Sequence, residues 1–428
     1  MTTIDSANRW YRRGTRLAAV VAGCIWIGLA GAYAVGPWPF DPYGVLVAAD
    51  HLAFYTPARF VLEGRDGDFY RYEIVQQVQA ERFPGQWDGL EAFRNPPFYA
   101  LLYVPTAGFP YPASALIWTG VSLGCLVLGV RWLGAVDPWR TAFWAATFYP
   151  VYCVISYGQN SLLSFAILAA TYRLLLSERR FAAGCVAGLL WFKPPLLLGL
   201  FVWWALDIRQ FWRCWLGVVF TGTVLVCGSY PIIPAAWAGF IDSLTHNATF
   251  AEFDQWKMHN PRAFWRLLLP GESLGSVRTL LTLALSAMGL VAFLRLRNRR
   301  RNEIGILFGA TVALTLWISP HALIYEWAIA VIPAILWWNH APEHRPRWRC
   351  LFAVLWVTFL VATDFDSVVW WVEREWLGMA RPWMIQFSIP VAGWVGWQAV
   401  RTLISEPQPV GSHGSEMSVN SVPVTSIP

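Results

Sequence analysis

Long runs without a charged residue decide what this chain can fold into. Three of them, residues 17–40, 214–241 and 383–400, contain no Asp, Glu, Lys or Arg. A helix needs about 20 apolar residues to cross the hydrocarbon core of a bilayer. Because the bilayer offers no partner for an unpaired backbone group, such segments must be helical. The chain is therefore expected to cross a membrane several times.

The composition agrees with this reading. Of the 428 residues, 56% are hydrophobic and 14% are charged, whereas average soluble proteins have about 25% charged residues. The 28 tryptophans are of the type that gathers at membrane–water boundaries. The net charge of +6 does not indicate a nucleic-acid partner, because much of the Lys and Arg falls in short loops, where it orients a membrane protein. We expect membrane lipids as partners and no nucleic acid.

About twelve apolar segments follow one another along the chain. They are residues 17–36, 97–109, 111–133, 139–156, 160–176, 181–206, 213–233, 277–296, 303–319, 322–338, 349–363 and 383–402. The pattern predicts an all-α polytopic membrane protein with about 12 transmembrane helices. Residues 1–404 then form a single transmembrane domain. Residues 405–428 are Pro, Ser, Gly and Val without periodicity, which predicts a disordered cytoplasmic tail.

Arginine sets the expected orientation. Arginine clusters lie at residues 9–16, 209–213, 295–301 and 345–349. By this count they share one side, which the positive-inside rule makes cytoplasmic. Both termini of this integral inner (plasma) membrane protein are then cytoplasmic. The pair Arg179-Arg180 falls on the outer side instead, and a break of the 181–206 segment at Lys193-Pro194 would change the parity there.

Three polar stretches, residues 37–96, 234–276 and 364–382, are expected outside the cytoplasm. The first is the longest and forms a long first extracytoplasmic loop. Within it, the helical spacing of residues 52–62 predicts a helix that lies on the membrane surface. The second is rich in aromatic residues, which suits a lid that dips into the interface.

Asp50 stands where the first apolar segment delivers the chain to the outer surface. His51, Tyr55 and Arg59 follow it at near-helical spacing. A carboxylate beside an apolar boundary has its pKa raised by desolvation and can act as a general base. The alternative is an interfacial carboxylate that caps a surface helix.

Polar groups inside apolar segments are costly and therefore suggest function. Gln159 and Asn160 interrupt an uncharged stretch, residues 141–172, where a plain turn between two helices is the alternative. Lys193 is flanked by Leu and Trp residues and by two prolines. Such a lysine either extends to the interface or meets an anion, and phosphate is its natural partner.

Ser319-Pro320-His321, followed by Tyr325-Glu326, is expected at an outer turn. His321 is a candidate ligand for phosphate or a sugar hydroxyl, with Glu326 orienting it. A lone histidine is more often structural, but this one shares the outer face with Asp50. The sequence has no P-loop, GxGxxG, HExxH or nucleophile elbow. We therefore expect a transferred group that is activated by a lipid phosphate and not by a nucleotide.

Taken in order, these segments resemble the integral-membrane glycosyltransferases of the C superfamily (GT-C), most closely glycosyltransferase family 87. The matching stretches are residues 50–64, 95–105, 158–163, 188–198 and 319–325. The likeness spans residues 17 to about 340. The chain departs from the family pattern at His51, where an aromatic or apolar residue is more usual, and at Glu326, where an Asp is commoner.

The resemblance implies a GT-C-like fold in which residues 1–404 are the catalytic domain and residues 37–96 the first outer loop. It implies inverting transfer of a hexose such as mannose, or of a pentose, from a polyprenyl-phosphate donor to an envelope glycan or glycolipid acceptor on the outer side. It assigns Asp50 as general base. The implied donor-binding residues are Lys193, Arg59, His321, Gln159 and Asn160, with His51, Tyr55 and Glu326 in support. We expect no cofactor, and metal dependence stays open, since no carboxylate pair points clearly to metal ligands.

Two other classes stay open. An O-antigen ligase-like enzyme would also use lipid-linked sugars outside the cell, but would carry its signature in a large loop late in the chain, whereas the largest polar loop here is the first. A lipid or solute transporter would explain the spans and Lys193. It would also show internal repeats and paired broken helices, which we do not find in the sequence.

Overall fold

The computed structural model describes residues 3–42, 44–87, 89–246, 255–378 and 383–405. The predicted tail, residues 405–428, lies outside this part of the chain except for its first residue. The described residues are helical and contain no strand, only two isolated bridges that pair Phe40 with Leu46 and Met258 with Leu323. An all-helical membrane protein is thus confirmed.

The helices have the following bounds. The α-helices are α1 Thr3–Val35, α2 Ala49–Leu62, α3 Tyr72–Arg82, α4 Val104–Ala107, α5 Tyr111–Trp132, α6 Pro138–Ala146, α7 Tyr149–Tyr157, α8 Ser161–Leu176, α9 Arg180–Gly188, α10 Leu198–Leu206, α11 Ile208–Ser229, α12 Pro234–His246, α13 Pro261–Leu268, α14 Gly275–Arg299, α15 Ile304–Ile318, α16 Val331–His340, α17 Arg345–Trp371 and α18 Ser388–Ile404. The 3₁₀ elements are η1 Asp66–Asp68, η2 Pro97–Leu102, η3 Leu189–Phe192, η4 Pro194–Leu197, η5 Gln255–Lys257, η6 Glu272–Leu274, η7 Ile324–Ala330 and η8 Pro342–His344, and η9 Val372–Trp376 is a π-helix.

Among the described residues, five helices are long and apolar enough to cross a membrane. They are Thr15–Val35, Tyr111–Trp132, Ile208–Ser229, Glu272–Arg299 and Pro342–Thr363. Shorter apolar helices are Ser161–Leu176, Arg180–Phe192, Pro194–Leu206 and Ile304–Ile318. These lengths support a polytopic membrane protein, but they do not establish the predicted number of twelve.

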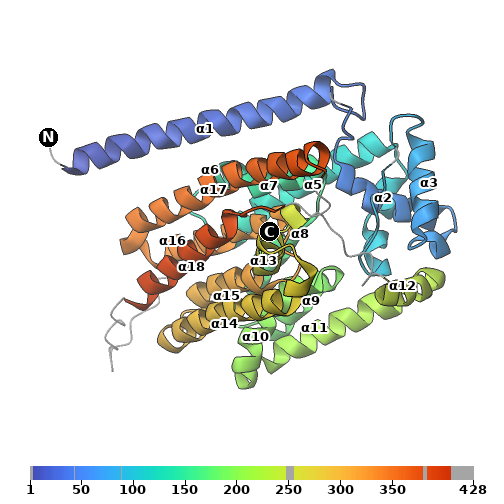
Figure 1. Cartoon of the computed structure of the whole chain (residues 1–428). Coiled ribbons are helices and arrows are strands. Elements are labelled where there is room, and N and C mark those ends of the chain that lie inside the picture. The colour runs from blue at the N-terminus through green and yellow to red at the C-terminus, as the bar shows by residue number, and fades with distance from the viewer. Residues whose placement is uncertain (1–2, 43, 88, 247–254, 379–382, 406–428) are drawn as a thin grey trace.

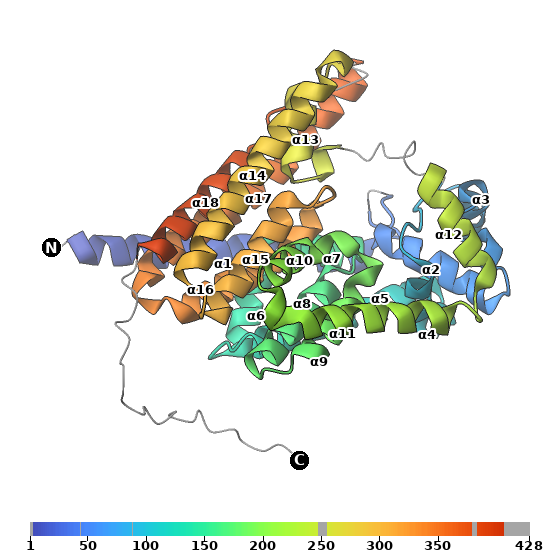
Figure 2. The same ribbon diagram turned by 90° about the horizontal axis from the view of Figure 1, so that it is seen from below.

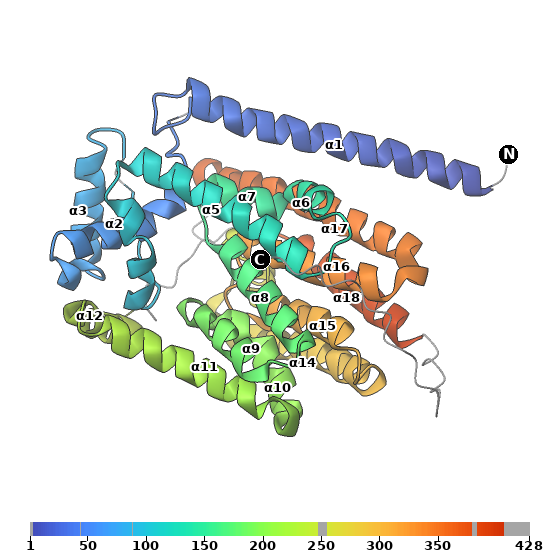
Figure 3. The same cartoon turned by 180° about the vertical axis from the view of Figure 1, so that it is seen from behind.

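The bundle has a polar-loop end and an opposite end. Figures 1 and 3 show α2, α3 and α12 together at one end, and α18 ending at the other. Helix α1 runs along the edge of the bundle, and the Nε1 of Trp26 donates to the Ala146 carbonyl at 3.0 Å. Figure 2 shows α14, α17 and α18 inclined to α11.

Helix α2 forms where the sequence predicted a helix, but it does not lie on the membrane surface. Nine of its residues, from His51 to Ala58 and Phe60, are buried inside the protein. Its partners include the aromatic side chains of Tyr99 and Tyr103, which pack against Phe54. The mean apolar character of the segment reflects burial in protein and not contact with lipid.

The predicted span 97–109 is wrong. Its residues form the 3₁₀ element η2 and the four-residue helix α4, because Pro96, Pro97 and Pro105 lack the amide protons that a continuous helix needs. Helix α5 then starts at the polar-loop end, where the Tyr111 hydroxyl lies 2.9 and 2.7 Å from the carbonyls of Val47 and Ala48. Residues 97–110 therefore stay at this end.

The predicted span 181–206 is broken in two at Lys193. Helix α9 and η3 lead to the break, and η4 and α10 lead away from it, since Pro194 and Pro195 cannot continue the hydrogen-bond ladder. The far ends of the two arms lie together, because Arg180 donates to the Gln210 carbonyl at 3.0 Å and Asp207 pairs with Arg297. Lys193 is thus at the tip of a hairpin.

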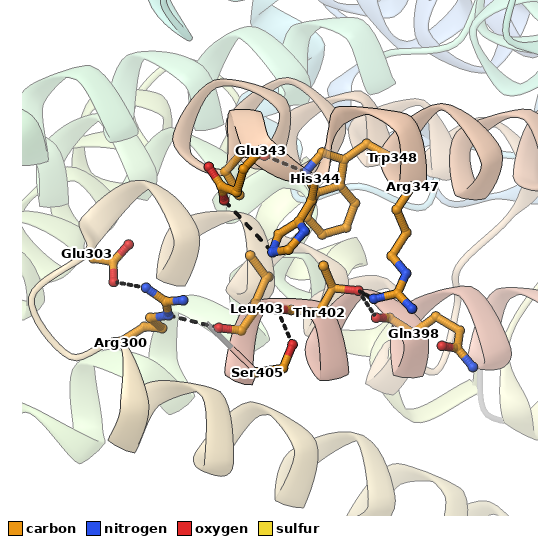
Figure 4. Close-up of polar contacts among 11 residues, drawn as sticks. Arg300, Glu303, Glu343, His344, Arg347, Trp348, Gln398, Thr402, Leu403 and Ser405 are labelled. Carbon is orange, nitrogen blue, oxygen red and sulfur yellow. Dashed lines mark hydrogen bonds and ion pairs between the residues drawn. The ribbon is translucent and has the colours of Figure 1, made fainter. Parts of the chain in front are cut away.

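The opposite end of the bundle is tied together by arginine (Figure 4). Arg300 donates to the Leu403 carbonyl at 2.8 Å and pairs with Glu303 at 2.8 Å. Arg347 donates to the Thr402 hydroxyl at 2.9 Å. These contacts join the ends of α14, α17 and α18, so the basic residues of this end are part of the fold as well as charges at its surface.

Candidate functional site

Asp50 is held at the start of α2 by an unusual local backbone. Ala48, which precedes the helix, has φ 54° in the left-handed region, and the Tyr111 hydroxyl binds the carbonyls just before it. The Asp50 carboxylate accepts a hydrogen bond from Gln159 Nε2 at 2.7 Å. Asp50 is half-buried.

The turn that carries Gln159 packs directly on the start of α2. Gly158 has φ 70°, and a Cβ placed there would lie 2.8 Å from His51 Cβ and 2.9 Å from Ala48 Cβ. The structure therefore requires glycine at this position for two reasons, conformation and space. This close approach brings the Gln159 amide to Asp50 and fixes its direction.

Lys193 points from the hairpin tip into the same group of residues. Its Nζ lies 2.7 Å from Glu326 Oε1 and 3.5 Å from Asn160 Oδ1, and 5.1 Å from the centre of the Tyr325 ring. The Asn95 side chain donates to the Phe192 carbonyl at 2.8 Å and holds the tip in place. Glu326, predicted to orient His321, is instead the partner of Lys193.

His321 lies on the turn after α15. Burial and the positive charges of Arg262 and Arg94 lower the pKa of His321. Arg94 also acts on Glu91, so His321 and the carboxylates share one charged environment. Direct contacts thus join Asp50 to Gln159, and Lys193 to Asn160 and Glu326, and His321 lies shortly before Glu326 on the same segment.

Sequence reasoning missed three charged residues of this site. Glu91 is held by the buried amide of Gln79, which accepts from the Glu91 amide and donates to its carbonyl, both at 2.9 Å. Arg94 follows on the same loop, and Lys257 lies on η5. The only sequence signal for Glu91 and Arg94 is their position directly ahead of Asn95-Pro96. Lys257 belongs to the polar stretch 234–276, which the sequence predicts to be a lid.

The charges of the site act on one another. Burial raises the pKa of Asp50, opposed by the hydrogen bond from Gln159 and by the positive charges of Lys257 and Lys193. Burial and the negative charge of Asp50 raise the pKa of Glu91 to about 8. At neutral pH Glu91 is therefore favoured as the neutral acid.

Three predicted residues of α2 have other partners. The Nε2 of His51 shares a hydrogen bond with Ser114 Oγ at 2.9 Å in a buried aromatic surrounding. The Tyr55 hydroxyl donates to the Phe109 carbonyl at 2.8 Å. Arg59 pairs with Glu63 at 2.9 Å, two to three turns along the helix from Asp50. These side chains anchor α2, and the structure does not bring Arg59 to Lys193.

A large apolar cavity lies elsewhere. It has a volume of about 1820 Å³ and is lined by α1, α6, α13, η7 and helices α14 to α18. None of the charged residues around Asp50 is in its wall. In the described part of the chain, no three His, Cys, Asp or Glu side chains gather as metal ligands, and we assign none.

Comparison with known families gives one result. The family model described as glycosyltransferase family 87 matches residues 93–320, more than half of the chain. The matched region contains Gln159, Asn160 and Lys193, begins after Asp50 and Glu91, and ends one residue before His321. No curated protein and no solved structure matches the chain.

Proposed function

Because this chain belongs to glycosyltransferase family 87, we propose that it transfers a hexose such as mannose, or a pentose, from a polyprenyl-phosphate donor to a hydroxyl of an envelope glycan or glycolipid. The chain is a membrane glycosyltransferase. The observation that carries the proposal further is the half-buried Asp50, whose carboxylate is bound by Gln159 and set beside cationic residues at a polar end of the bundle.

Asp50 is the general base of the proposed reaction. The acceptor oxygen attacks the anomeric carbon while Asp50 takes its proton, and the bond between that carbon and the phosphate oxygen breaks. The electron pair leaves with the lipid phosphate, so the configuration inverts. Base catalysis of this kind contributes about 10²–10⁴-fold. The hydrogen bond from Gln159 occupies one carboxylate oxygen and leaves the other for the acceptor.

Stabilisation of the leaving phosphate is the larger contribution expected for such a transfer. Lys193, with Asn160 beside it, is the proposed ligand of this phosphate, and His321 lies in the same charged environment. Arg59 is not included, since its guanidinium is bound to Glu63 and the Ala107 carbonyl. The GT-C-like architecture remains part of this proposal.

The broken hairpin supports a revised path through the membrane. If residues 97–110 stay outside and the 181–206 segment enters from the cytoplasmic side and turns back at Lys193, both termini are cytoplasmic. The cluster Arg179-Arg180 then moves to the cytoplasmic side with the other arginine clusters, as the positive-inside rule expects. The site around Asp50 lies on the extracytoplasmic side in this arrangement.

The test is transfer of label from lipid to acceptor. Purified full-length protein is incubated with polyprenyl-phosphate mannose, glucose and arabinose, each labelled in the sugar, in the presence of envelope membrane extract. We expect one donor to lose its label to the extract. Release of label from none of them, or transfer only from a nucleotide sugar, contradicts the proposed donor class.

A further inference from the structure

The segment Trp256–Asn260 forms a strap that is fixed on three sides. Its contacts are Gln386 Nε2 to the Trp256 carbonyl at 3.0 Å, His259 N to the Ala322 carbonyl at 2.7 Å, His259 Nδ1 with Ser388 Oγ at 2.7 Å, Trp327 Nε1 to the His259 carbonyl at 2.9 Å, and Asn260 Nδ2 to the Pro320 carbonyl at 3.1 Å. The partners come from the turn of His321, from η7 and from the start of α18.

The anchors of the strap are buried, and Lys257 is not. His259, Gln386 and Ser388 are fully buried, whereas Lys257 is exposed. An exposed lysine on a loop is ordinarily mobile. Here the backbone on its C-terminal side is bound to the turn of His321 and to η7, and the Nζ of Lys257 lies 5.3 Å from the centre of the Trp256 ring.

The strap lies beside the segment that contacts Lys193, because Met258 pairs with Leu323, and Tyr325 and Glu326, which follow Leu323, contact Lys193. The positive charge of Lys257 lowers the pKa of both Asp50 and Glu91, although the three residues come from distant parts of the sequence. The charge of Lys193 is shared with the buried Glu326, whose Oε1 lies 2.7 Å from the Nζ. A phosphate that approaches Lys193 therefore meets a cation that already has a carboxylate partner.

The choice of amino acid supports the same conclusion. The chain contains 32 basic residues, of which only Lys193 and Lys257 are lysine. Arginine provides the remaining positive charge, including the orienting clusters. A lysine ammonium is a compact point charge, and both residues of this type lie at one site, on segments that are fixed by unrelated contacts.

We propose that Lys257 binds the phosphate of the lipid-linked donor together with Lys193. The inference rests on the proposed donor. A sugar phosphodiester carries one negative charge, and the monoester that leaves carries up to two near neutral pH. A second cation is thus needed most as the bond to the sugar breaks, and Lys257 stabilises the leaving group more than the intact donor.

The presence of only two lysines makes a direct test possible. The full-length protein in detergent is treated with an amine-acetylating reagent, and the modification of Lys193 and Lys257 is measured by peptide mass spectrometry. The probe is farnesyl phosphate, and farnesol is the control with the same tail and no phosphate. We expect farnesyl phosphate, and not farnesol, to slow acetylation of Lys257.

Two variants complete the test. Lys257→Ala should weaken binding of farnesyl phosphate by about tenfold or more, as expected for loss of a charged hydrogen bond, while Lys257→Arg should retain part of the affinity. The matched control is Arg71→Ala, an exposed cation at the same end of the bundle that pairs with Asp68. It should bind as the unaltered protein does.

The failures are distinguishable. Protection of Lys193 alone, with unchanged affinity of Lys257→Ala, overturns the role of Lys257 and leaves the proposed donor intact. Equal protection by farnesol overturns the assignment to phosphate. If the unaltered protein does not bind farnesyl phosphate at all, the proposed donor class fails, and the inference fails with it.

Discussion

The Nζ of Lys193 lies 2.7 Å from the Oε1 of Glu326, and both side chains are largely withdrawn from solvent. Removing one partner of a buried ion pair leaves the other charge uncompensated, which costs about 3–5 kcal/mol in measured cases. The pair therefore has a structural role in addition to its proposed role in donor binding.

A double-mutant cycle separates these two roles. Lys193→Met and Glu326→Gln should each lower the thermal unfolding midpoint, and the double variant should recover most of the loss, because neither charge is then left alone. Binding of farnesyl phosphate should be weakened in both variants that lack Lys193. Additive losses of stability in the double variant would show that the two groups do not form a pair.

Asp50→Asn should abolish sugar transfer while binding of the lipid phosphate stays nearly unchanged, because the amide keeps the size of the side chain and cannot take a proton. The measurements are label transfer and farnesyl phosphate affinity. Glu63→Gln, which removes a carboxylate from the other end of α2, is the matched control and should transfer sugar normally. Normal turnover by Asp50→Asn would exclude Asp50 as the base.

The pKa of Glu91, about 8, predicts a dependence of stability on pH. Its unfolded value is near 4.5, so between pH 4.5 and 8 the folded state holds a proton that the unfolded state has lost. Stability then falls as the pH rises through this window. Glu91→Gln should remove this part of the dependence, seen as a flatter plot of unfolding midpoint against pH.

The same residue predicts a change in the activity profile. Above pH 8 Glu91 ionises beside Asp50 and Lys257, and the added negative charge opposes a phosphate. Transfer by the unaltered protein should therefore decline above pH 8, and Glu91→Gln should keep its activity there. Loss of activity in Glu91→Gln at pH 7 would mean that the neutral acid is not the working form of Glu91.

Gly158→Ala should reduce transfer strongly, since the new methyl group would lie 2.8 Å from His51 Cβ and displace the Gln159 amide from Asp50. Gly134→Ala is the matched control. Gly134 has φ 77° and no atom within 4 Å of the added Cβ, so it carries the same backbone strain without the clash. Equal effects of the two substitutions on transfer would show that close packing of Gly158 on His51 is not needed for transfer.

The revised path through the membrane predicts which side is labelled at Glu178. A single cysteine placed there in a cysteine-free background should react with an impermeant thiol reagent only after the cells have been permeabilised. A cysteine at Asp68, between α2 and α3, should react in sealed cells. Labelling of position 178 in sealed cells would show that this position is outside the cytoplasm, as expected if residues 181–206 form one span.

The sequence predicted the residues that interrupt apolar helices better than those on loops. Gln159, Asn160 and Lys193 were recognisable because a polar group within an apolar run is costly and therefore has a reason to be there. Glu91 and Lys257 stood in polar stretches, where a charge is unremarkable, and only tertiary contacts bring them to Asp50. Their placement depends on Gln79 and on the strap, whose partners are far away in the sequence.

The errors in the helices have a common physical cause. The segment 97–109 is apolar enough for a span, but its prolines interrupt the helix that a span requires. The segment 52–62 shows that helical spacing in a polar loop does not distinguish a helix covered by lipid from one covered by protein. Apolar patterning predicts that a helix face is buried, but it does not show whether protein or lipid covers that face.

The hairpin that carries Lys193 has a consequence for the synthesis of the protein. Its arms, Arg180–Phe192 and Pro194–Leu206, rise by about 1.5 Å per residue and are each shorter than the roughly 30 Å thickness of the hydrocarbon core. Neither arm is long enough to be released into lipid as an independent helix. The carboxylate of Glu326, moreover, is made much later in the chain than the ammonium of Lys193. The nascent hairpin therefore lacks its final partners until the helices that follow it have been made, and the candidate site is completed only then.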